Sequence, residues 1–131
     1  MVKLFPLKYE GAFKALLTLE EALNAAEYSI FIQDAAIQRF EYTTEALWKC
    51  LQSYLKENEG IVCASPKACL REAKKMRILN DTETELALEM IDDRNLTTHT
   101  YHEEVAKMLY KRLPQYSLLM RNILERIGQN S

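Results

Sequence analysis

Glycine and proline are scarce in this sequence, each occurring only three times in 131 residues. These residues form most of the tight turns that connect short strands, so a chain with so few of them favours long helices. We therefore expect an all-α protein, an antiparallel up-and-down four-helix bundle with an additional short helix. A chain of this length is expected to form one domain, covering residues 1–131.

Apolar residues recur at helical spacing in five segments. The expected helices cover residues 7–26, 30–57, 66–79 and 82–96, with a last one from about residue 101 to the end. Gly60 is expected to end the second helix, and Ser65 and Asn80 to cap the helices that follow them. Pro114 is expected to kink or split the last helix, because proline removes a backbone donor and clashes one turn back.

The charge balance argues against a protein that grips duplex nucleic acid over a broad surface. The chain has 17 basic and 19 acidic residues, a net charge of −2, whereas such proteins carry a basic footprint. Any contact with nucleic acid is therefore expected to be local or brief.

Three cysteines, Cys50, Cys63 and Cys69, form no CxxC pair and no zinc-binding set with the histidines. An odd number of cysteines without a secretory signal indicates reduced thiols and a cytoplasmic location. No window contains the roughly 18 apolar residues of a membrane span.

The segment DRNLTTHTY, residues 93–101, contains three threonines that interrupt the helical pattern. Thr97 is expected to lie at the end of one helix, and Thr100 to cap the next in a capping box with Glu103. This structural explanation accounts for the threonines but not for the arginine and the histidine among them.

Arg94 lies four residues after Met90 and three after Ile91, on the apolar side of its helix. A guanidinium directed toward a core needs a partner, and Glu41 occupies an inward position on the second helix. Two interpretations remain open: a structural ion pair between Arg94 and Glu41, or a functional site.

A break in the helix between Arg94 and His99 would allow the two side chains to converge, whereas five residues of continuous helix would separate them by about 140°. An imidazole and a guanidinium at one phosphodiester suit RNA cleavage without a metal. The histidine exchanges protons with the 2′-hydroxyl or the leaving oxygen, and the arginine stabilises the charge of the transition state. A symmetric dimer would supply two such histidines, one as acid and one as base.

The octapeptide from Arg94 to Tyr101 resembles the signature of the HEPN domains, in which arginine, four residues, histidine, one residue and tyrosine follow one another. More narrowly, the chain resembles the nucleotidyltransferase substrate-binding proteins, toxin partners of minimal nucleotidyltransferase antitoxins. The resemblance extends over residues 37–55, 65–76, 88–106 and 113–124.

This resemblance implies a homodimer in which the signature motifs face each other across the subunit cleft. It implies that Arg94 and His99 occupy the ribonuclease positions, with Asn95 as a polar neighbour, and that Tyr101 receives AMP from the nucleotidyltransferase. The family name implies instead a subunit that presents a substrate to that enzyme or binds a nucleotide beside it. The chain departs from the family pattern at His102, where an acidic residue is usual, and at Met76-Arg77, which replace a turn of small residues.

Two further groups of residues bear on metal binding and on phosphate binding. His99, His102 and Glu103 lack another strong ligand at a suitable offset, so we expect no metal and no cofactor. Four basic residues on the third helix form either a solvated helix face or a shelf that contacts the phosphates of RNA or of a nucleotide: Lys67, Arg71, Lys74 and Lys75.

Three hypotheses follow. The first is a metal-independent ribonuclease that works opposite a nucleotidyltransferase antitoxin. The second is a silent subunit that binds a substrate or a nucleotide for that enzyme. The third is a purely structural bundle in which Glu41 and Arg94 form an internal ion pair.

Overall fold

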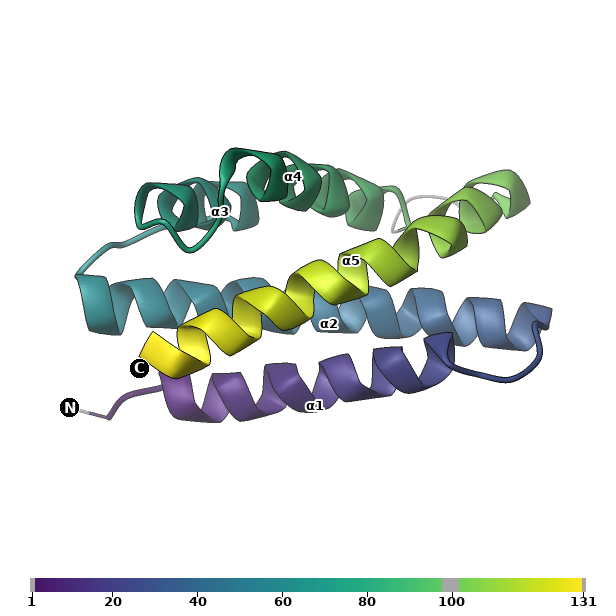
Figure 1. Ribbon diagram of the computed structural model, residues 1–131, viewed down its shortest axis with the longest axis horizontal. Coiled ribbons are helices and arrows are strands. Elements are labelled where there is room, and N and C mark those ends of the chain that lie inside the picture. Colours follow the sequence, from purple (N-terminus) through teal and green to yellow (C-terminus); the bar gives the residue numbers. More distant parts are fainter. Residues whose placement is uncertain (1, 98–101, 131) are drawn as a thin grey trace.

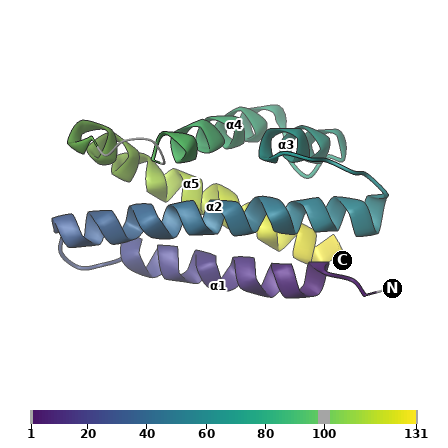
Figure 2. The same ribbon diagram turned by 180° about the vertical axis from the view of Figure 1, so that it is seen from behind.

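The computed structural model describes residues 2–97 and 102–130. In that part of the chain the helices are α1 (Phe5–Leu23), α2 (Ile30–Glu59), α3 (Pro66–Lys75), α4 (Asp81–Leu96) and α5 (Glu103–Asn130). Helices α1, α2, α4 and α5 run alternately in opposite directions, and the short α3 lies beside α4 (Figure 1). Seen from behind, α2 passes in front of α5, with α1 on one side and α3 and α4 on the other (Figure 2). The expected all-α helical bundle is confirmed.

The helix ends follow the capping chemistry expected from the sequence. The Ser65 hydroxyl accepts a hydrogen bond from the Ala68 N–H at 3.2 Å, at the start of α3. Asn80 and Glu83 form a reciprocal capping box at the start of α4. Gly60 ends α2 in the left-handed conformation with φ of 68°, which glycine adopts without a steric penalty.

Helix α1 begins two residues earlier than expected because a distant carboxylate satisfies its first backbone donors. The N–H groups of Leu4 and Phe5 each donate to Glu57 of α2 at 3.2 Å. Unpaired N–H groups at a helix start need such an acceptor. This contact spans more than fifty residues, so the local sequence does not reveal it.

Helix α5 differs from expectation at its start. It begins at Glu103, so Glu103 is its first helical residue rather than the third, as the expected capping box requires. The carbonyl of His102 accepts the first helical hydrogen bond, from Ala106; Thr100 lies outside the described residues. Of the two outcomes expected at Pro114, a kink or a split, the split does not occur, because the buried residues on either side of it, Leu113 and Tyr116, anchor both halves in the core.

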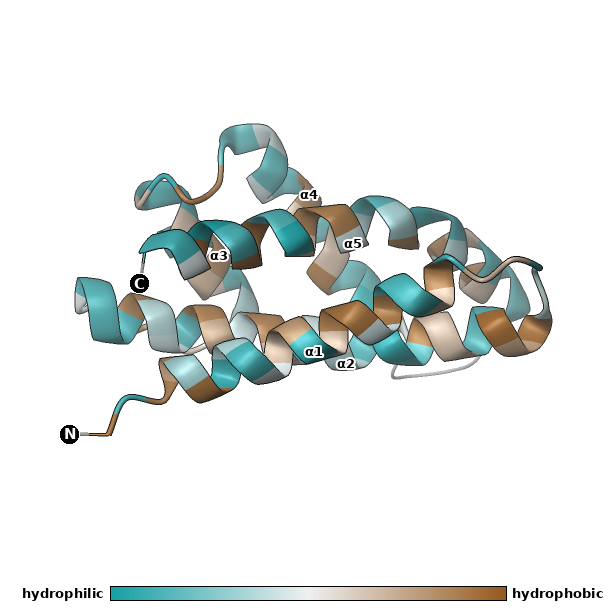
Figure 3. Ribbon diagram, turned by 60° about the horizontal axis from the view of Figure 1, so that its bottom comes forward, coloured by the Kyte–Doolittle hydropathy of each residue, from teal (hydrophilic) through white to brown (hydrophobic). Residues whose placement is uncertain are grey.

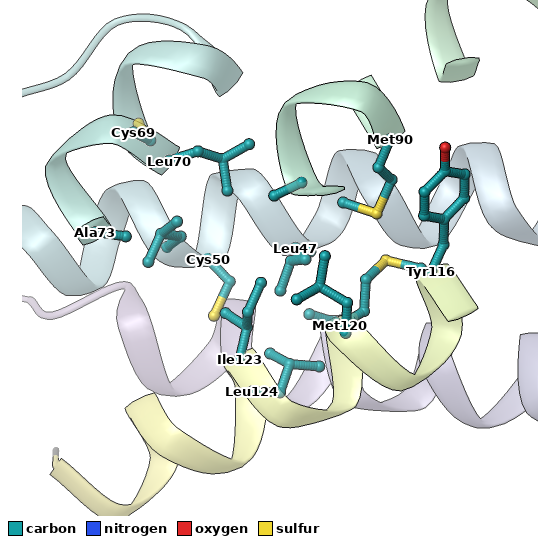
Figure 4. Close-up of a cluster of buried hydrophobic side chains, with 14 of the residues drawn as sticks. Leu47, Cys50, Cys69, Leu70, Ala73, Met90, Tyr116, Met120, Ile123 and Leu124 are labelled. Carbon is teal, nitrogen blue, oxygen red and sulfur yellow. The ribbon is translucent and has the colours of Figure 1, made fainter. Parts of the chain in front are cut away.

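The core lies where α2 and α5 cross and where α1, α3 and α4 cover them (Figure 4). Its fully buried side chains include Leu51 of α2 and Leu70 of α3, together with Met90 of α4 and Met120 of α5. Burial of this apolar surface is the main favourable contribution to folding. The apolar core therefore holds helices α1 to α5 together.

Cys63 and Cys69 form a disulfide, with 5.3 Å between their Cα atoms. The expectation of reduced thiols was wrong for this pair. Cys63 precedes α3 and Cys69 lies within its first turns, so the chain entering the helix brings the two sulfurs together. Cys50 is a free, buried thiol, and burial raises its pKa to about 12.

The N-terminal end of α2 consists of hydrophobic residues and lies at one end of the bundle (Figure 3). Ile30 and Phe31 at this end are 41% and 81% exposed. No helix in residues 2–97 and 102–130 is long and apolar enough to cross a membrane.

Candidate functional site

The structure places Arg94 in the last turn of α4, directly before the threonine-rich segment. The predicted end of this helix is confirmed: α4 ends at Leu96, and the Thr97 hydroxyl donates to the Arg94 carbonyl at 2.7 Å. Asn95 lies on the exposed surface next to Arg94. His99 and Tyr101 lie outside the described residues, so their predicted roles stay predictions.

Arg94 pairs with Glu45 of α2, with 3.3 Å between its Nη2 and the Glu45 Oε2. The predicted pairing of Arg94 with Glu41 was wrong by one helical turn. Four residues of helix advance about 6 Å along the axis. The periodicity therefore identified the correct face of α2 but not the level at which α4 meets it.

Glu45 is charged at neutral pH. Burial raises the pKa of its carboxyl group, but the neighbouring Trp48, Lys49 and Arg94 outweigh that effect and leave the pKa below its ordinary value of 4.5. The resulting carboxylate forms an ion pair with the Arg94 guanidinium, and Nε of Arg94 is buried without a hydrogen-bond partner among the described residues. Glu45 thus restrains Arg94 without occupying all its donors.

A small cavity of about 70 Å³ lies between α2 and the facing ends of α4 and α5. Its polar lining comes from Glu41, Thr97 and His102, and the rest of the wall is apolar. Thr97 and His102 are the residues on either side of the segment 98–101. Glu41 therefore lines a cavity beside the signature segment.

A buried cluster of polar side chains next to Arg94 was not predicted from the sequence. Asp93 is only 5% exposed, and Arg112 of α5 donates from Nη1 to both of its carboxylate oxygens, at 2.9 and 3.1 Å. The hydroxyl of Tyr116, also in α5, donates to the Asp93 Oδ2. Burial and the adjacent Asp93 carboxylate raise the pKa of Tyr116 well above its ordinary range, so the phenol stays protonated and acts as a donor.

A signal for this cluster was present in the sequence. Tyr116 falls on the same apolar stripe as Leu109, Leu113 and Met120, which indicated that it is buried. A buried tyrosine hydroxyl usually has a polar partner. The sequence pattern does not identify that partner, because Asp93 lies on a different helix.

Acidic neighbours partly neutralise the basic residues of α3. Lys67 pairs with Asp92 at 2.6 Å, Lys74 with Asp81 at 3.1 Å and Lys75 with Glu72 at 3.2 Å. Arg71 is exposed and forms no ion pair within the described residues. Exposed pairs of this kind contribute little to stability and exchange readily. Contact between this run and phosphates stays a prediction.

No three His, Cys, Asp or Glu side chains gather at one place within residues 2–97 and 102–130. Of the residues weighed as ligands, His102 is exposed and Glu103 pairs with Lys107 at 3.3 Å.

Comparisons with known proteins relate this chain to one family. Residues 7–129 match the family described as "Nucleotidyltransferase substrate binding protein like". The probable ribonuclease HepT of Haemophilus influenzae is 29% identical over 100 residues, which make up 73% of this chain and 67% of that protein. A crystal structure of a protein from Thermus thermophilus is 52% identical, with a TM-score of 0.85, and the match covers 88% of this chain and 98% of that one.

A more distant solved structure shares the fold. It is the tri-AMPylated HEPN toxin of Shewanella oneidensis in complex with the MNT antitoxin. It has a TM-score of 0.78 and 11% identity, over 98% of this chain and 99% of that one. At this identity the likeness shows the fold alone.

Proposed function

The chain belongs to the nucleotidyltransferase substrate-binding-like family, a HEPN family, and from this premise we propose that it is the toxin partner of a minimal nucleotidyltransferase antitoxin and a metal-independent ribonuclease. The observation that carries the proposal is the state of Arg94. Its guanidinium is half-buried at the end of α4, pairs with Glu45, and keeps Nε without a hydrogen-bond partner among the described residues. It directly precedes the segment that contains His99. A relative with the name of a probable ribonuclease supports the same chemistry.

In the proposed reaction, the 2′-oxygen of a ribose attacks the adjacent phosphorus while the bond from phosphorus to the 5′-oxygen breaks. His99 of one subunit removes the 2′-proton as a base, and His99 of the second subunit donates a proton to the departing 5′-oxygen as an acid, because an imidazole titrates near neutral pH. Arg94 stabilises the negative charge that accumulates on the phosphoryl oxygens. Asn95 and Glu41 support the site as polar neighbours. No metal or cofactor takes part, and RNA as substrate implies a cytoplasmic location.

Tyr101 is the proposed point of control. The partner nucleotidyltransferase joins the tyrosine oxygen to the α-phosphorus of ATP, pyrophosphate leaves, and the phenolic proton passes to a base or to water. The AMP group adds negative charge and bulk two residues from His99. Modified protein is therefore unable to accept the phosphate backbone of RNA.

We also propose a homodimer through the outer face of α2. Phe31 and Tyr42 of this helix are 81% and 68% exposed, and their spacing of eleven residues, three helical turns, places them on the same face. Glu45, the partner of Arg94, lies three residues beyond Tyr42 at the edge of this face. Large exposed apolar side chains on one face favour an interface. Pairing of two copies here would bring both signature segments to one groove.

Expression of the chain in a bacterial host tests the proposal. Wild-type protein is expected to arrest growth, and His99→Ala is expected to relieve the arrest at equal protein level. Co-expression with a minimal nucleotidyltransferase is expected to restore growth and to add AMP to Tyr101, which mass spectrometry detects. Tyr101→Phe should remain toxic with the antitoxin present. Full toxicity of His99→Ala would contradict the ribonuclease proposal.

The second candidate is a non-catalytic subunit that binds a substrate or a nucleotide for the nucleotidyltransferase. The description of the matching family as substrate-binding favours it, as does the basic run on α3, where Arg71 forms no ion pair with any described residue. This candidate predicts no growth arrest, a stable complex with the nucleotidyltransferase, and weaker nucleotide binding by that complex after Arg71→Ala. Cleavage of RNA by the chain alone would exclude it.

A further inference from the structure

Three consecutive residues at the end of α4 pair with three different helices. Successive side chains on a helix point about 100° apart, so they fan out around its axis. The pairs are Asp92 with Lys67 of α3 at 2.6 Å, Asp93 with Arg112 of α5 at 2.9 Å, and Arg94 with Glu45 of α2 at 3.3 Å.

These pairs matter because apolar packing does not extend to the end of α4. Ile91 is its last buried apolar side chain, and Leu96 is 47% exposed. The orientation of the last turn therefore depends on polar contacts. Of the three pairs, only the one made by Asp93 has a buried carboxylate: its side chain is 6% exposed, compared with 61% for Asp92 and 38% for Glu45.

A buried carboxylate is a costly way to stabilise a helix. Replacement of buried ion pairs by apolar residues is often neutral or stabilising, and the best use of such pairs is to fix one geometry among several. Asp93 accepts from Arg112 through both oxygens and from the Tyr116 hydroxyl. The planar guanidinium and the rigid phenol thus hold this carboxylate in both position and orientation.

The location of the cluster indicates what it orients. Asp93 belongs to α4, whereas Arg112 and Tyr116 belong to α5, and these two helices are joined through the segment that contains His99. The cluster therefore fixes the last turn of α4 relative to α5. Arg94 is the next residue after Asp93, so any rotation of this turn would move its guanidinium.

We propose that Asp93 is a positioning residue for the signature site. Held by Arg112 and Tyr116, it sets the orientation of the last turn of α4 and thereby the place of the Arg94 guanidinium. This inference rests on the proposed ribonuclease function of Arg94 and His99.

The test compares Asp93→Asn with Asp92→Asn in the full-length protein. The second variant is a matched control, because it removes the same charge from the same turn at an exposed pair. For cleavage of a single-stranded RNA, kcat is expected to fall about 10-fold or more in Asp93→Asn, since small misplacements of catalytic groups have effects of that size. KM is expected to change by no more than about twofold, and Asp92→Asn to stay within about twofold of wild type in both constants.

A second measurement separates this proposal from the ribonuclease proposal. The ¹⁵N-labelled side chain of Arg94 gives an Nε–H signal in an NMR spectrum whether or not the protein cleaves RNA. The signal is expected to shift or broaden in Asp93→Asn and to remain unchanged in Asp92→Asn. If the wild type cleaves no RNA but this difference is seen, the ribonuclease proposal fails and the positioning role stands.

Tyr116→Phe keeps the test decisive if Asp93→Asn does not fold, because it removes one hydroxyl and no charge. It is expected to shift the Arg94 signal in the same direction and to lower kcat about threefold. The positioning role is overturned if the folded variants leave the Arg94 signal and kcat as they are in Asp92→Asn. In that case the cluster serves stability alone.

Discussion

Arg94 forms its ion pair with Glu45 and not with Glu41, one turn earlier on the same helix. The pair joins α4 to α2, whose outer face carries the exposed Phe31 and Tyr42. The ion pair restrains the Arg94 guanidinium, but its Nε has no hydrogen-bond partner among the described residues.

The Arg94–Glu45 pair predicts a measurable coupling. In a double-mutant cycle for Arg94→Ala and Glu45→Ala, the interaction should contribute about 0.5 kcal/mol to the free energy of unfolding, as is usual for partly exposed pairs. The same cycle with Glu41→Ala in place of Glu45→Ala should give a coupling near zero. Urea unfolding of the wild type and of the single and double variants provides the values. A larger coupling with Glu41 would contradict the observed pairing.

Stability should decrease in acid partly through Glu83. The pKa of Glu83 lies below its ordinary value of 4.5, mainly because Arg126 donates to its carboxylate and also because the Asn80 N–H does. A carboxyl group whose pKa is lowered in the folded state stabilises the protein above the unfolded-state pKa, and this contribution is lost as the pH falls through the folded-state pKa.

Glu83→Gln is therefore expected to reduce the difference in free energy of unfolding between about pH 7 and about pH 3, measured by urea denaturation. Gln can still take part in a capping box, so the helix start is retained. Glu85→Gln, at an exposed position on the same helix, is the control and should leave the difference as in the wild type. An unchanged pH dependence in Glu83→Gln would contradict this account.

Thiol titration checks the disulfide between Cys63 and Cys69. Protein unfolded without reductant should expose one reactive thiol per chain, that of Cys50, and three after reduction, the total number of cysteines. In the folded protein Cys50 should react slowly, because it is buried and its pKa is raised to about 12. The closed loop is short, so reduction should lower the free energy of unfolding by about 2 kcal/mol. Three thiols before reduction would contradict the structure.

Arg77 occupies a position that favours glycine. Its φ is 62°, and the Ile78 N–H donates to the Ala73 carbonyl at 2.9 Å in the pattern of a helix C-terminal cap. Arg77→Gly is expected to raise the free energy of unfolding by about 0.5 kcal/mol, since the relief of strain exceeds the added flexibility of the unfolded chain. Met76→Gly, at a neighbouring position with φ of −83°, should lower it by about 0.5–1 kcal/mol. Thermal unfolding measures both changes.

Local patterns in the sequence predicted the helices well, because capping and apolar spacing act over a few residues. Ser65, Asn80 and Gly60 mark helix ends through contacts with near neighbours, and the structure has these ends. Two of the failed predictions involve contacts between distant parts of the chain. Glu57 caps α1 from another helix, and Glu45 replaces Glu41 because the level at which helices cross depends on packing of the whole bundle.

The candidate site was predictable only in part. The position of Arg94 on an inward face followed from its spacing to Met90 and Ile91, and its half-buried state is confirmed. The role of Asp93 could not be predicted, because its partners lie nineteen and twenty-three residues further along the chain. The predicted roles of His99 and Tyr101 rest on the signature alone.

The proposed metal-independent ribonuclease activity is tested most directly by incubating a single-stranded RNA with the purified chain in the presence of EDTA. The wild type is expected to cleave the RNA, and His99→Ala and Arg94→Ala are each expected to reduce kcat/KM by about 100-fold or more. His102→Ala, a change of the only other histidine, should stay within about threefold of the wild type. If His99→Ala cleaves as fast as the wild type, or if EDTA abolishes cleavage by the wild type, the claim of a metal-independent histidine–arginine ribonuclease is contradicted.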